Sequence, residues 1–257
     1  MATDADARVA AGVTALSERD TERAGDEFTR AAWLSLADPR PDEGLSPFDA
    51  DDRGWVGAGL RWLVVAAVAY RVAGRDARAS RRGVAGIAVA RDLRTALSHP
   101  AQRACLLEVV ADFRVAAGMN DAVAAYRDAE DAYREAGPSV DDPRRLTTSP
   151  LFRAAAAPIE QVARGPANGE IAVEWADLHG GDPSDPGAFL ARRPAYKRQR
   201  FPSLLARVVE DGHLAAPRGT TEYGNDGFRC PECASTDVNW IAGRTLCLRC
   251  SAPMERA

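Results

Sequence analysis

Residues 21–37 read TERAGDEFTRAAWLSLA, and this stretch predicts a helix with one apolar face. Ala24, Phe28 and Ala31 recur at intervals of four and three residues, which is the spacing of one side of an α-helix. A second helical segment precedes it at residues 6–16, and the short polar stretch between them is too brief for anything but a turn. The chain therefore opens with a pair of antiparallel helices.

Two further helix pairs follow before Gly137 and Pro138 stop the pattern. Composition agrees with a mainly α fold, because the chain has 51 alanines and 32 of its 33 basic residues are arginine, and both types favour helices. The predicted pairs are 6–16 with 21–37, 55–73 with 77–97, and 101–117 with 121–136.

Composition and charge exclude several classes of protein. An apolar fraction of 46% in 257 residues supports a sizeable core and excludes wholesale disorder. The net charge of −4 excludes a protein that coats nucleic acid. The start is acidic and lacks a signal peptide, and the most apolar stretch, residues 62–70, is shorter than the roughly 20 residues of a membrane span. We expect a cytoplasmic chain without a membrane partner.

The helix pairs resemble the tetratricopeptide repeat, in which a small residue lies in the first helix and an Ala, an aromatic residue and an Ala lie at fixed offsets in the second. Arg78 and Arg82 depart from that pattern in the middle pair, and an ordinary Ala-rich bundle remains the alternative. The resemblance implies a helical-repeat domain over residues 1–136 that folds alone and binds a protein partner. The matching residues are Gly12, Ala24, Phe28 and Ala31 in the first pair, and Phe113, Ala122, Tyr126 and Ala129 in the third.

Residues 138–150 are rich in Pro and Asp and predict a linker, after which residues 150–227 form a small mixed α/β middle module. Its layout of short helices, a last helix ending near residue 212 and a hairpin-like tail is similar to a winged helix-turn-helix. The alternative is a helical linker module that packs the C-terminal part of the chain onto the repeats.

The C-terminal residues 228–257 carry the strongest motif of the chain. Two Cys-x-x-Cys pairs, separated by thirteen residues, can place four thiolates around one tetrahedral ion, and the text between them predicts two strands. This segment resembles a zinc ribbon, with Zn²⁺ as cofactor. A redox dithiol is the competing hypothesis, but the βαβ pattern that it requires is absent from the sequence. The predicted ligands are Cys230, Cys233, Cys247 and Cys250.

A basic stretch in the middle module predicts a contact surface for DNA or RNA, because bases alternate there with aromatic rings and no acid interrupts residues 186–207. The alternative is that these bases pair with acids elsewhere or keep a surface helix soluble. The candidate contact residues are Arg192, Arg193, Tyr196, Lys197, Arg198, Arg200 and Phe201.

Charge is also unevenly distributed among the helices. Residues 1–54 carry thirteen acids and six arginines, whereas residues 71–94 carry seven arginines and two acids. Such runs usually mark solvated faces, but opposite charges on adjacent repeats can also close against one another.

Glu174, Asp177 and His179 form a weaker cluster that matches no metal-ligand spacing. We therefore expect no catalytic or cofactor-binding residues and no enzyme activity. The favoured function is a non-enzymatic adaptor that binds protein partners through the helical repeats. The second hypothesis is a nucleic-acid-binding regulator that uses the middle module and the ribbon, and an enzyme built on residues 174–179 ranks last.

Overall fold

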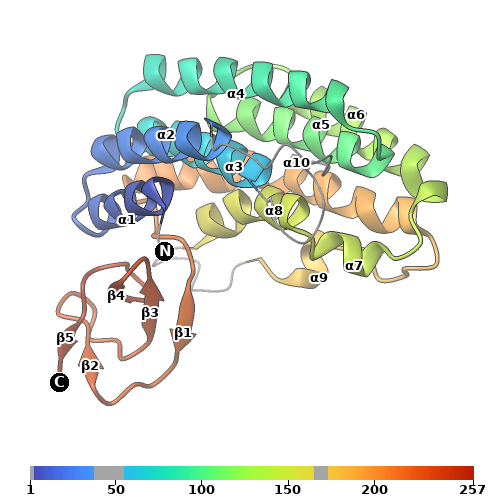
Figure 1. Cartoon of the computed structure of the whole chain (residues 1–257). Coiled ribbons are helices and arrows are strands. Elements are labelled where there is room, and N and C mark those ends of the chain that lie inside the picture. Colours follow the sequence, from blue (N-terminus) through green and yellow to red (C-terminus); the bar gives the residue numbers. More distant parts are fainter. Residues whose placement is uncertain (1–2, 38–54, 165–172) are drawn as a thin grey trace.

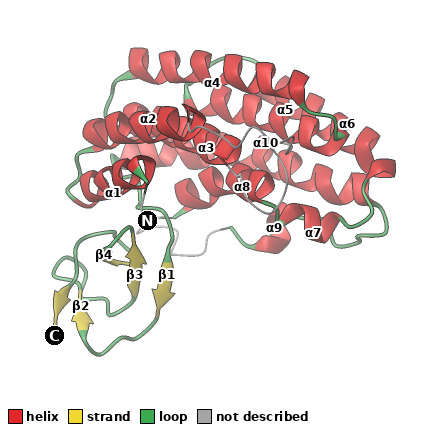
Figure 2. Cartoon of the chain, viewed as in Figure 1, coloured by secondary structure: helices red, strands yellow, loops and turns green. Residues whose placement is uncertain are grey.

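The structure is a computed structural model that describes residues 3–37, 55–164 and 173–257 (Figure 1). It is mainly helical, with a small strand-bearing part at the C-terminus, as predicted (Figure 2). The helices are α1 (Asp4–Ser17), α2 (Thr21–Ala37), α3 (Trp55–Val72), α4 (Asp76–Ala96), α5 (Pro100–Ala116), α6 (Ala122–Ala136), the 3₁₀-helix η1 (Gly137–Ser139), α7 (Pro143–Thr147), α8 (Pro150–Ala163), α9 (Trp175–Leu178) and α10 (Pro186–Asp211). The strands are β1 (Thr220–Glu222), β2 (Phe228–Arg229), β3 (Val238–Ile241), β4 (Arg244–Cys247) and β5 (Glu255–Arg256).

The first six helices pack in chain order, each against the next. Local sequence explains where they begin. At α1, the Thr3 N–H donates to Asp6 Oδ2 (2.9 Å) and the Asp6 N–H donates to Thr3 Oγ1 (3.1 Å), which forms a capping box. At α5, Pro100 occupies the first turn, where its missing N–H costs nothing.

Phe28 is the aromatic centre of the first helix pair. It is fully buried and stacks on Trp62 of α3, with ring centroids 5.1 Å apart. Its ring also lies on Gly12 of α1 so closely that a Cβ atom there would be 2.6 Å from Cε1. The absence of a side chain at Gly12 is therefore what lets α1 and α2 approach each other.

Truncating this ring should be costly. We expect Phe28→Ala to lower the free energy of unfolding by about 3–5 kcal/mol, because it removes a buried ring and leaves a cavity. Urea denaturation followed by circular dichroism measures the change. Val84→Ala is the control, since Val84 is 58% exposed and should change the stability by less than about 0.5 kcal/mol. A loss below about 1 kcal/mol for Phe28→Ala would contradict this packing.

Part of the unevenly distributed charge pairs between α2 and α4. Arg75 Nε at the start of α4 lies 2.8 Å from Glu22 Oε2 of α2. Arg78 Nη1 lies 3.0 Å from Glu22 Oε1 and 3.2 Å from Asp26 Oδ1. For these residues the opposite charges close against one another, which is the second of the two interpretations of the charge runs.

α3 is the central helix of the fold. Among the described residues it is the helix long and apolar enough to cross a membrane by length and composition, and 67% of that window is buried inside the protein. α2, α4, α5 and α8 all pack against it. Burial by four neighbouring helices accounts for its apolar composition, as expected for a core helix.

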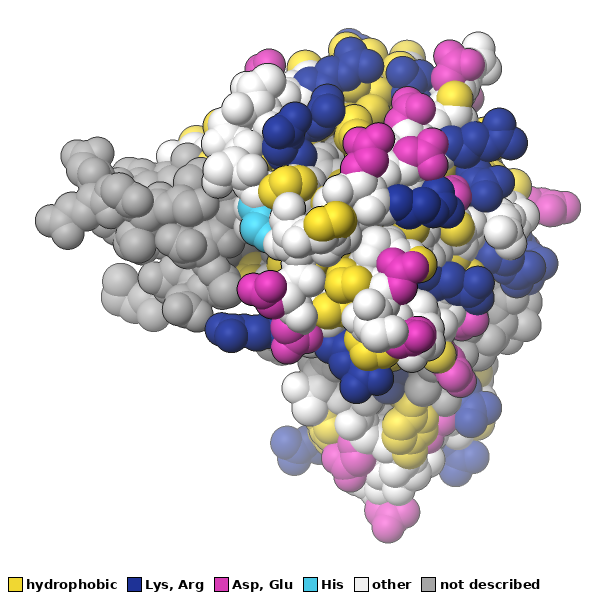
Figure 3. All heavy atoms as spheres, turned by 90° about the vertical axis from the view of Figure 1, so that its right-hand side faces the viewer, with side chains coloured by type: hydrophobic (Ala, Val, Ile, Leu, Met, Phe, Trp, Pro, Cys, Tyr) yellow, Lys and Arg dark blue, Asp and Glu magenta, His cyan; other side chains and the backbone are white. Residues whose placement is uncertain are grey.

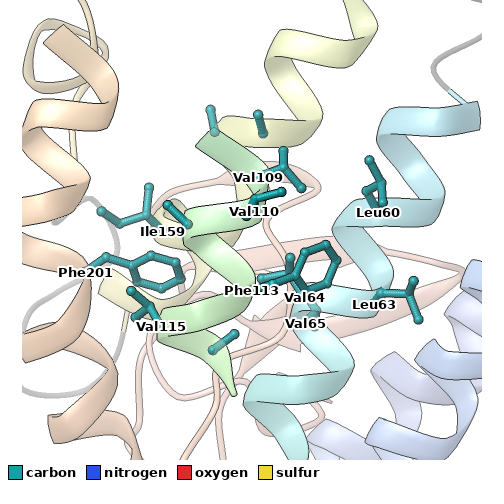
Figure 4. Packing of buried hydrophobic residues seen from close by; sticks show 14 of the residues in the cluster. Leu60, Leu63, Val64, Val65, Val109, Val110, Phe113, Val115, Ile159 and Phe201 are labelled. Atoms are coloured by element: carbon teal, nitrogen blue, oxygen red, sulfur yellow. The ribbon is translucent and has the colours of Figure 1, made fainter. Parts of the chain in front are cut away.

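The predicted division between residues 1–136 and 150–227 does not separate two cores. α8 packs on α3 and α5, α10 packs on α6, and a single hydrophobic core runs through all of them. Figure 4 shows Ile159 of α8 and Phe201 of α10 beside Val110 and Val115 of α5. Because these two helices cover α5, we do not expect residues 1–136 to be stable alone, in contrast to the sequence-based prediction.

The C-terminal strands begin earlier than predicted. β1 pairs antiparallel with β3, with Thr220 opposite Trp240, and β3 pairs with β4. β2 pairs with β5 in a second small sheet. β1 thus belongs to the cysteine-bearing part rather than to a wing on residues 150–227. The winged-helix comparison is therefore not supported within the described part of that module, from which residues 165–172 are excluded.

This strand-bearing part is fastened to the helices by specific contacts. Arg164, which follows α8, is buried and donates from Nη1 to the Ala216 carbonyl (2.6 Å) and from Nη2 to the Leu248 carbonyl (3.0 Å). Leu246 packs on Val13 of α1. Arg19, between α1 and α2, donates from Nη2 to the Cys250 carbonyl (3.2 Å). These contacts fix the cysteine cluster against α1 and the end of α8.

Candidate metal centre

The two Cys-x-x-Cys segments fold as matched knuckles. In the first, the Cys230 N–H donates to the Ser235 carbonyl (2.9 Å), and the residue after the second cysteine, Ala234, has φ 58°. In the second, the Cys247 N–H donates to the Ala252 carbonyl (2.7 Å) and Ser251 has φ 62°. Both knuckles therefore share one backbone geometry, although their sequences differ between and after the cysteines.

The four predicted ligands lie together. All four Sγ atoms are within 4.8 Å of one another, with 3.5 Å between Cys230 and Cys250 and 3.5 Å between Cys233 and Cys247. Sulfurs at about 2.3 Å from a tetrahedral zinc ion are separated by roughly 3.8 Å. The four thiols are free rather than disulfide-bonded. Their geometry can therefore hold a metal ion such as zinc.

The surroundings favour the thiolate form at one of these cysteines. Hydrogen bonds from the Cys250 thiol, and from the backbone N–H groups of Cys250 and Arg249, lower the pKa of the Cys247 thiol. Three of the four cysteines are buried and Cys233 is exposed. A metal ligand must be deprotonated, so the shift at Cys247 is in the direction that metal binding requires. The hydrogen bond with Cys247 raises the pKa of Cys250, and burial raises that of Cys233, so a bound ion would have to displace the protons of these two thiols.

Nearby arginines serve the fold around the cluster. Arg249 Nε lies 2.9 Å from Asp237 Oδ2, and the Gly224 N–H donates to Asp237 Oδ1 (3.0 Å). Arg244 Nε donates to Thr14 Oγ1 of α1 (3.0 Å). These bonds tie the loops around the cysteines to one another and to the helices.

The predicted nucleic-acid contacts do not form one surface. Arg193, Lys197 and Phe201 are buried, so for these three residues the prediction is wrong. They are spaced four apart on the face of α10 that packs into the helical core. Arg198 is paired with Glu130 of α6 (2.7 Å). Of the seven candidates, Arg192 and Arg200 are exposed and Tyr196 is half-buried.

Arg193 and Lys197 instead form a buried ion network with α5. Arg193 binds Glu108 through Nε (2.7 Å, to Oε1) and Nη2 (2.8 Å, to Oε2). Lys197 Nζ lies 2.7 Å from Glu108 Oε1 and 2.7 Å from Asp112 Oδ2, and donates to the Ala155 carbonyl (2.6 Å). All four charged side chains are at most 3% exposed, so none of them is solvated by bulk water.

Two tyrosines of α6 complete this network. Tyr126 donates from its hydroxyl to Asp112 Oδ1 (2.6 Å), and Tyr133 donates to Glu108 Oε2 (2.9 Å). Each carboxylate oxygen therefore has a hydrogen-bond donor. A fully satisfied buried network of this kind fixes the register of packed helices, here of α10 on α5 and α6.

Burial and pairing act differently on the two carboxylates. Burial works to raise the pKa of Glu108, but Arg193 and Lys197 outweigh it and lower that pKa to about 2. Burial raises the pKa of Asp112 to about 6, which Lys197 opposes only in part. Glu108 is thus firmly ionised at neutral pH, while the charge on Asp112 is held mainly by Lys197.

The cluster of Glu174, Asp177 and His179 builds a local turn. The Glu174 N–H donates to Asp177 Oδ2 (2.9 Å) as a capping box at α9. The His179 ring stacks on Trp175 at 4.4 Å, and its Nδ1 lies 2.9 Å from the Trp175 carbonyl oxygen. Burial lowers the pKa of His179. All three side chains are thus engaged with α9 and its ends.

The chain matches no known family model, no curated protein and no solved structure. What it does must therefore be inferred from its own residues.

Proposed function

We propose that this chain is a non-enzymatic adaptor. Its helical part binds a protein partner, and its four cysteines hold one structural Zn²⁺ in a zinc ribbon docked on the helices. The observation that carries the partner-binding role is a pair of exposed apolar side chains of α2, Trp33 and Leu34, of which Leu34 lines an open cleft at the N-terminal helices.

The ligand set supports a structural ion. Four thiolates fill a tetrahedral shell and leave no position for a reactive water molecule. The strand-bearing part also has a very small core of its own around these cysteines, namely Cys230, Cys247, Cys250 and Ala252 with Met254 packed on them. A bound zinc ion would supply the folding energy that so few apolar contacts cannot.

The contact between Phe28 and Gly12 supports the tetratricopeptide-like interpretation of the helices. In that repeat the aromatic residue of the second helix fits against a small residue of the first, and here the Phe28 ring occupies the space above Gly12. The ordered packing of α1 to α6 is also typical of stacked repeats. Such stacks present extended surfaces to protein partners.

The cleft has a volume of about 380 Å³ and lies among α1, α2 and α3. Leu34, Trp55 and Trp62 contribute apolar walls, and Asp4 and Asp6 lie at its acidic end. Trp33 and Leu34 are each 38% exposed. Aromatic and aliphatic side chains that stay exposed beside a cleft are typical of protein interfaces.

The test is affinity purification from the native host with nuclease treatment. We expect a protein to be retained by the wild type after nuclease and lost with Trp33→Ala/Leu34→Ala, while Val123→Ala, at a 47% exposed site on α6, retains it. A partner that binds all three proteins equally would contradict this surface. Loss of all bound material on nuclease treatment would favour the second function instead.

That second function is nucleic-acid binding. One observation favours it, although fewer contact residues are available than the sequence predicts. Arg192, Tyr196 and Arg200 share one face of α10 that is not buried in the core. On the face of the protein seen in Figure 3, basic and acidic side chains are interspersed. Arg192 and Arg200 are therefore the two predicted contact arginines that this face of α10 leaves exposed.

This gives a quantitative expectation for salt dependence. If both arginines contact duplex phosphates, log K should fall against log salt with a slope near −2, from about −0.9 per contact. Arg192→Glu/Arg200→Glu should then abolish the binding of labelled duplex in a fluorescence titration at low salt. Binding that is unchanged by this double reversal would exclude α10 as the contact surface.

A further inference from the structure

A second pocket, of about 620 Å³, opens between α3, α8 and the segment that precedes β1. Its walls combine apolar groups such as Ala58, Ala154 and Pro217 with several arginines. Three of these arginines are Arg61, Arg153 and Arg218, and the acid at its wall is Glu160. These four side chains carry an excess of two positive charges, and Arg164, which also lines the pocket, adds a third.

Arg61 is the most unusual of these groups. Its guanidinium carbon lies 4.5 Å from the centroid of the Trp62 ring, and its Nε is buried without a hydrogen-bond partner. No carboxylate of the described part of the chain forms an ion pair with it. Burial and the nearby Arg153 lower the pKa of Arg61, and Glu160 opposes this lowering only in part. A partly desolvated cation of this kind attracts an anion.

Neighbouring side chains of the same pocket also have charges without an ion pair or polar atoms without a hydrogen bond. Arg153 is exposed and makes no ion pair within the described ranges. Arg218 donates to two neutral hydroxyls, Thr221 Oγ1 (3.2 Å) and Tyr223 OH (3.1 Å), so its charge is not neutralised there. Gln161 is 3% exposed, and its Oε1 is buried without a hydrogen-bond donor.

We propose that this pocket binds a small organic anion, whose phosphate or carboxylate group meets Arg61 and whose hydroxyl or amine donates to Gln161 Oε1. Guanidinium groups match both kinds of oxyanion with paired hydrogen bonds. The volume lies within the range of about 300–1,000 Å³ that small-molecule sites occupy. Arg153 and Arg218 add long-range attraction at the walls. This site is independent of the proposed adaptor role.

Isothermal titration calorimetry of the full-length protein at constant ionic strength tests the proposal. The probes are ribose 5-phosphate, citrate, inorganic phosphate and, as the neutral control, ribose. We expect saturable binding of about one molecule of ribose 5-phosphate or citrate per chain, tighter than inorganic phosphate. The two organic probes carry an alcohol hydroxyl separate from the anionic group, which can donate to Gln161 Oε1 while that group binds Arg61. The preferred probe identifies the oxyanion as phosphate or carboxylate.

Four variants separate the site from general charge attraction. Arg61→Gln should weaken binding about tenfold or more, and Glu160→Gln should tighten it, since a repelling carboxylate is removed. Arg127→Gln makes the same charge change at an exposed arginine of α6 outside the pocket and should leave affinity unchanged. Arg153→Gln, at an exposed site, should also weaken binding.

Absence of saturable binding by all three anions would overturn the proposal. So would equal weakening by Arg61→Gln and Arg127→Gln, because that result would mean that net charge alone attracts the anion. Binding of ribose as tight as that of ribose 5-phosphate would also overturn it.

Discussion

Replacing Lys197 with methionine should lower the free energy of unfolding by about 3–5 kcal/mol, which is the usual cost of breaking a buried ion pair from one side. Methionine keeps the length of the side chain but removes the charge. Asp112 would then remain in the core with only the Tyr126 hydroxyl as a partner. A loss of this size is a large fraction of the roughly 5–15 kcal/mol that stabilises a typical domain.

Urea denaturation followed by helical circular dichroism measures this effect, and Arg192→Gln is the matched control. Arg192 lies on the same helix but is exposed, so its loss should cost less than about 0.5 kcal/mol. Lys197→Met combined with Asp112→Asn should recover much of the stability, because the uncompensated charge is gone while Tyr126 keeps an acceptor. A loss below about 1 kcal/mol for Lys197→Met would contradict the buried network.

The loss of stability caused by Lys197→Met should depend on pH in a defined direction. Asp112 has a folded pKa raised to about 6, so its contribution to stability is greatest when it is protonated and is lost as pH rises through that value. Without Lys197 the raised pKa moves higher still. The difference in stability between wild type and Lys197→Met should therefore shrink as the pH falls from about 8 to about 5.

The second large effect is expected on metal removal. Treating the protein with a chelator, or changing Cys247 to Ser, should loosen β1 to β5 while the helices keep their circular dichroism signal. Structural zinc contributes about 10–16 kcal/mol to the folding of zinc-finger peptides, and the small core around these cysteines cannot replace it. Hydrogen exchange at the amides of β3 and β4 should accelerate by about a hundredfold or more.

Cys105→Ala is the matched control for this experiment. Cys105 is the fifth cysteine and lies buried in α5, away from the cluster. Its loss should leave metal content and the protection of β3 and β4 unchanged. Unchanged protection of these strands after complete chelation would show that the metal does not hold them together.

The four cysteines could be identified from the sequence because each pair is local. A Cys-x-x-Cys spacing of three residues already brings two sulfurs to one side of a turn, and only the meeting of the two turns depends on the fold. The helices could also be predicted from the sequence, since their apolar periodicity is local too. For both features, interactions within a few residues decide the outcome.

The ion network could not be identified in the same way, because its partners are 85 residues apart in the chain. Without knowledge of that contact, the sequence suggests that Arg193 and Lys197 belong to a basic surface. Two signals were present: Glu108 and Asp112 lie four apart in an otherwise apolar helix, and Lys197 is the one lysine among 33 basic residues. Neither signal shows which residue is the ion-pair partner, so the burial of these charged side chains could not be inferred from the sequence.

The core that crosses the predicted domain boundary could not be predicted for a related reason. Residues 138–150 have the composition of a linker, but α8 and α10 return to cover α5 and α6, and such long-range packing is invisible to local composition. β1 shows the same limit on a smaller scale. Its three residues gain strand structure by pairing with β3, some twenty residues later in the chain.

Metal analysis of freshly purified, reduced full-length protein tests the central claim most directly. A ribbon held by Cys230, Cys233, Cys247 and Cys250 predicts about one zinc ion per chain, lost when any one of the four is changed to Ser and retained in Cys105→Ala. Protein that contains no zinc, iron or comparable ion, or that keeps its zinc in all four serine variants, would contradict it.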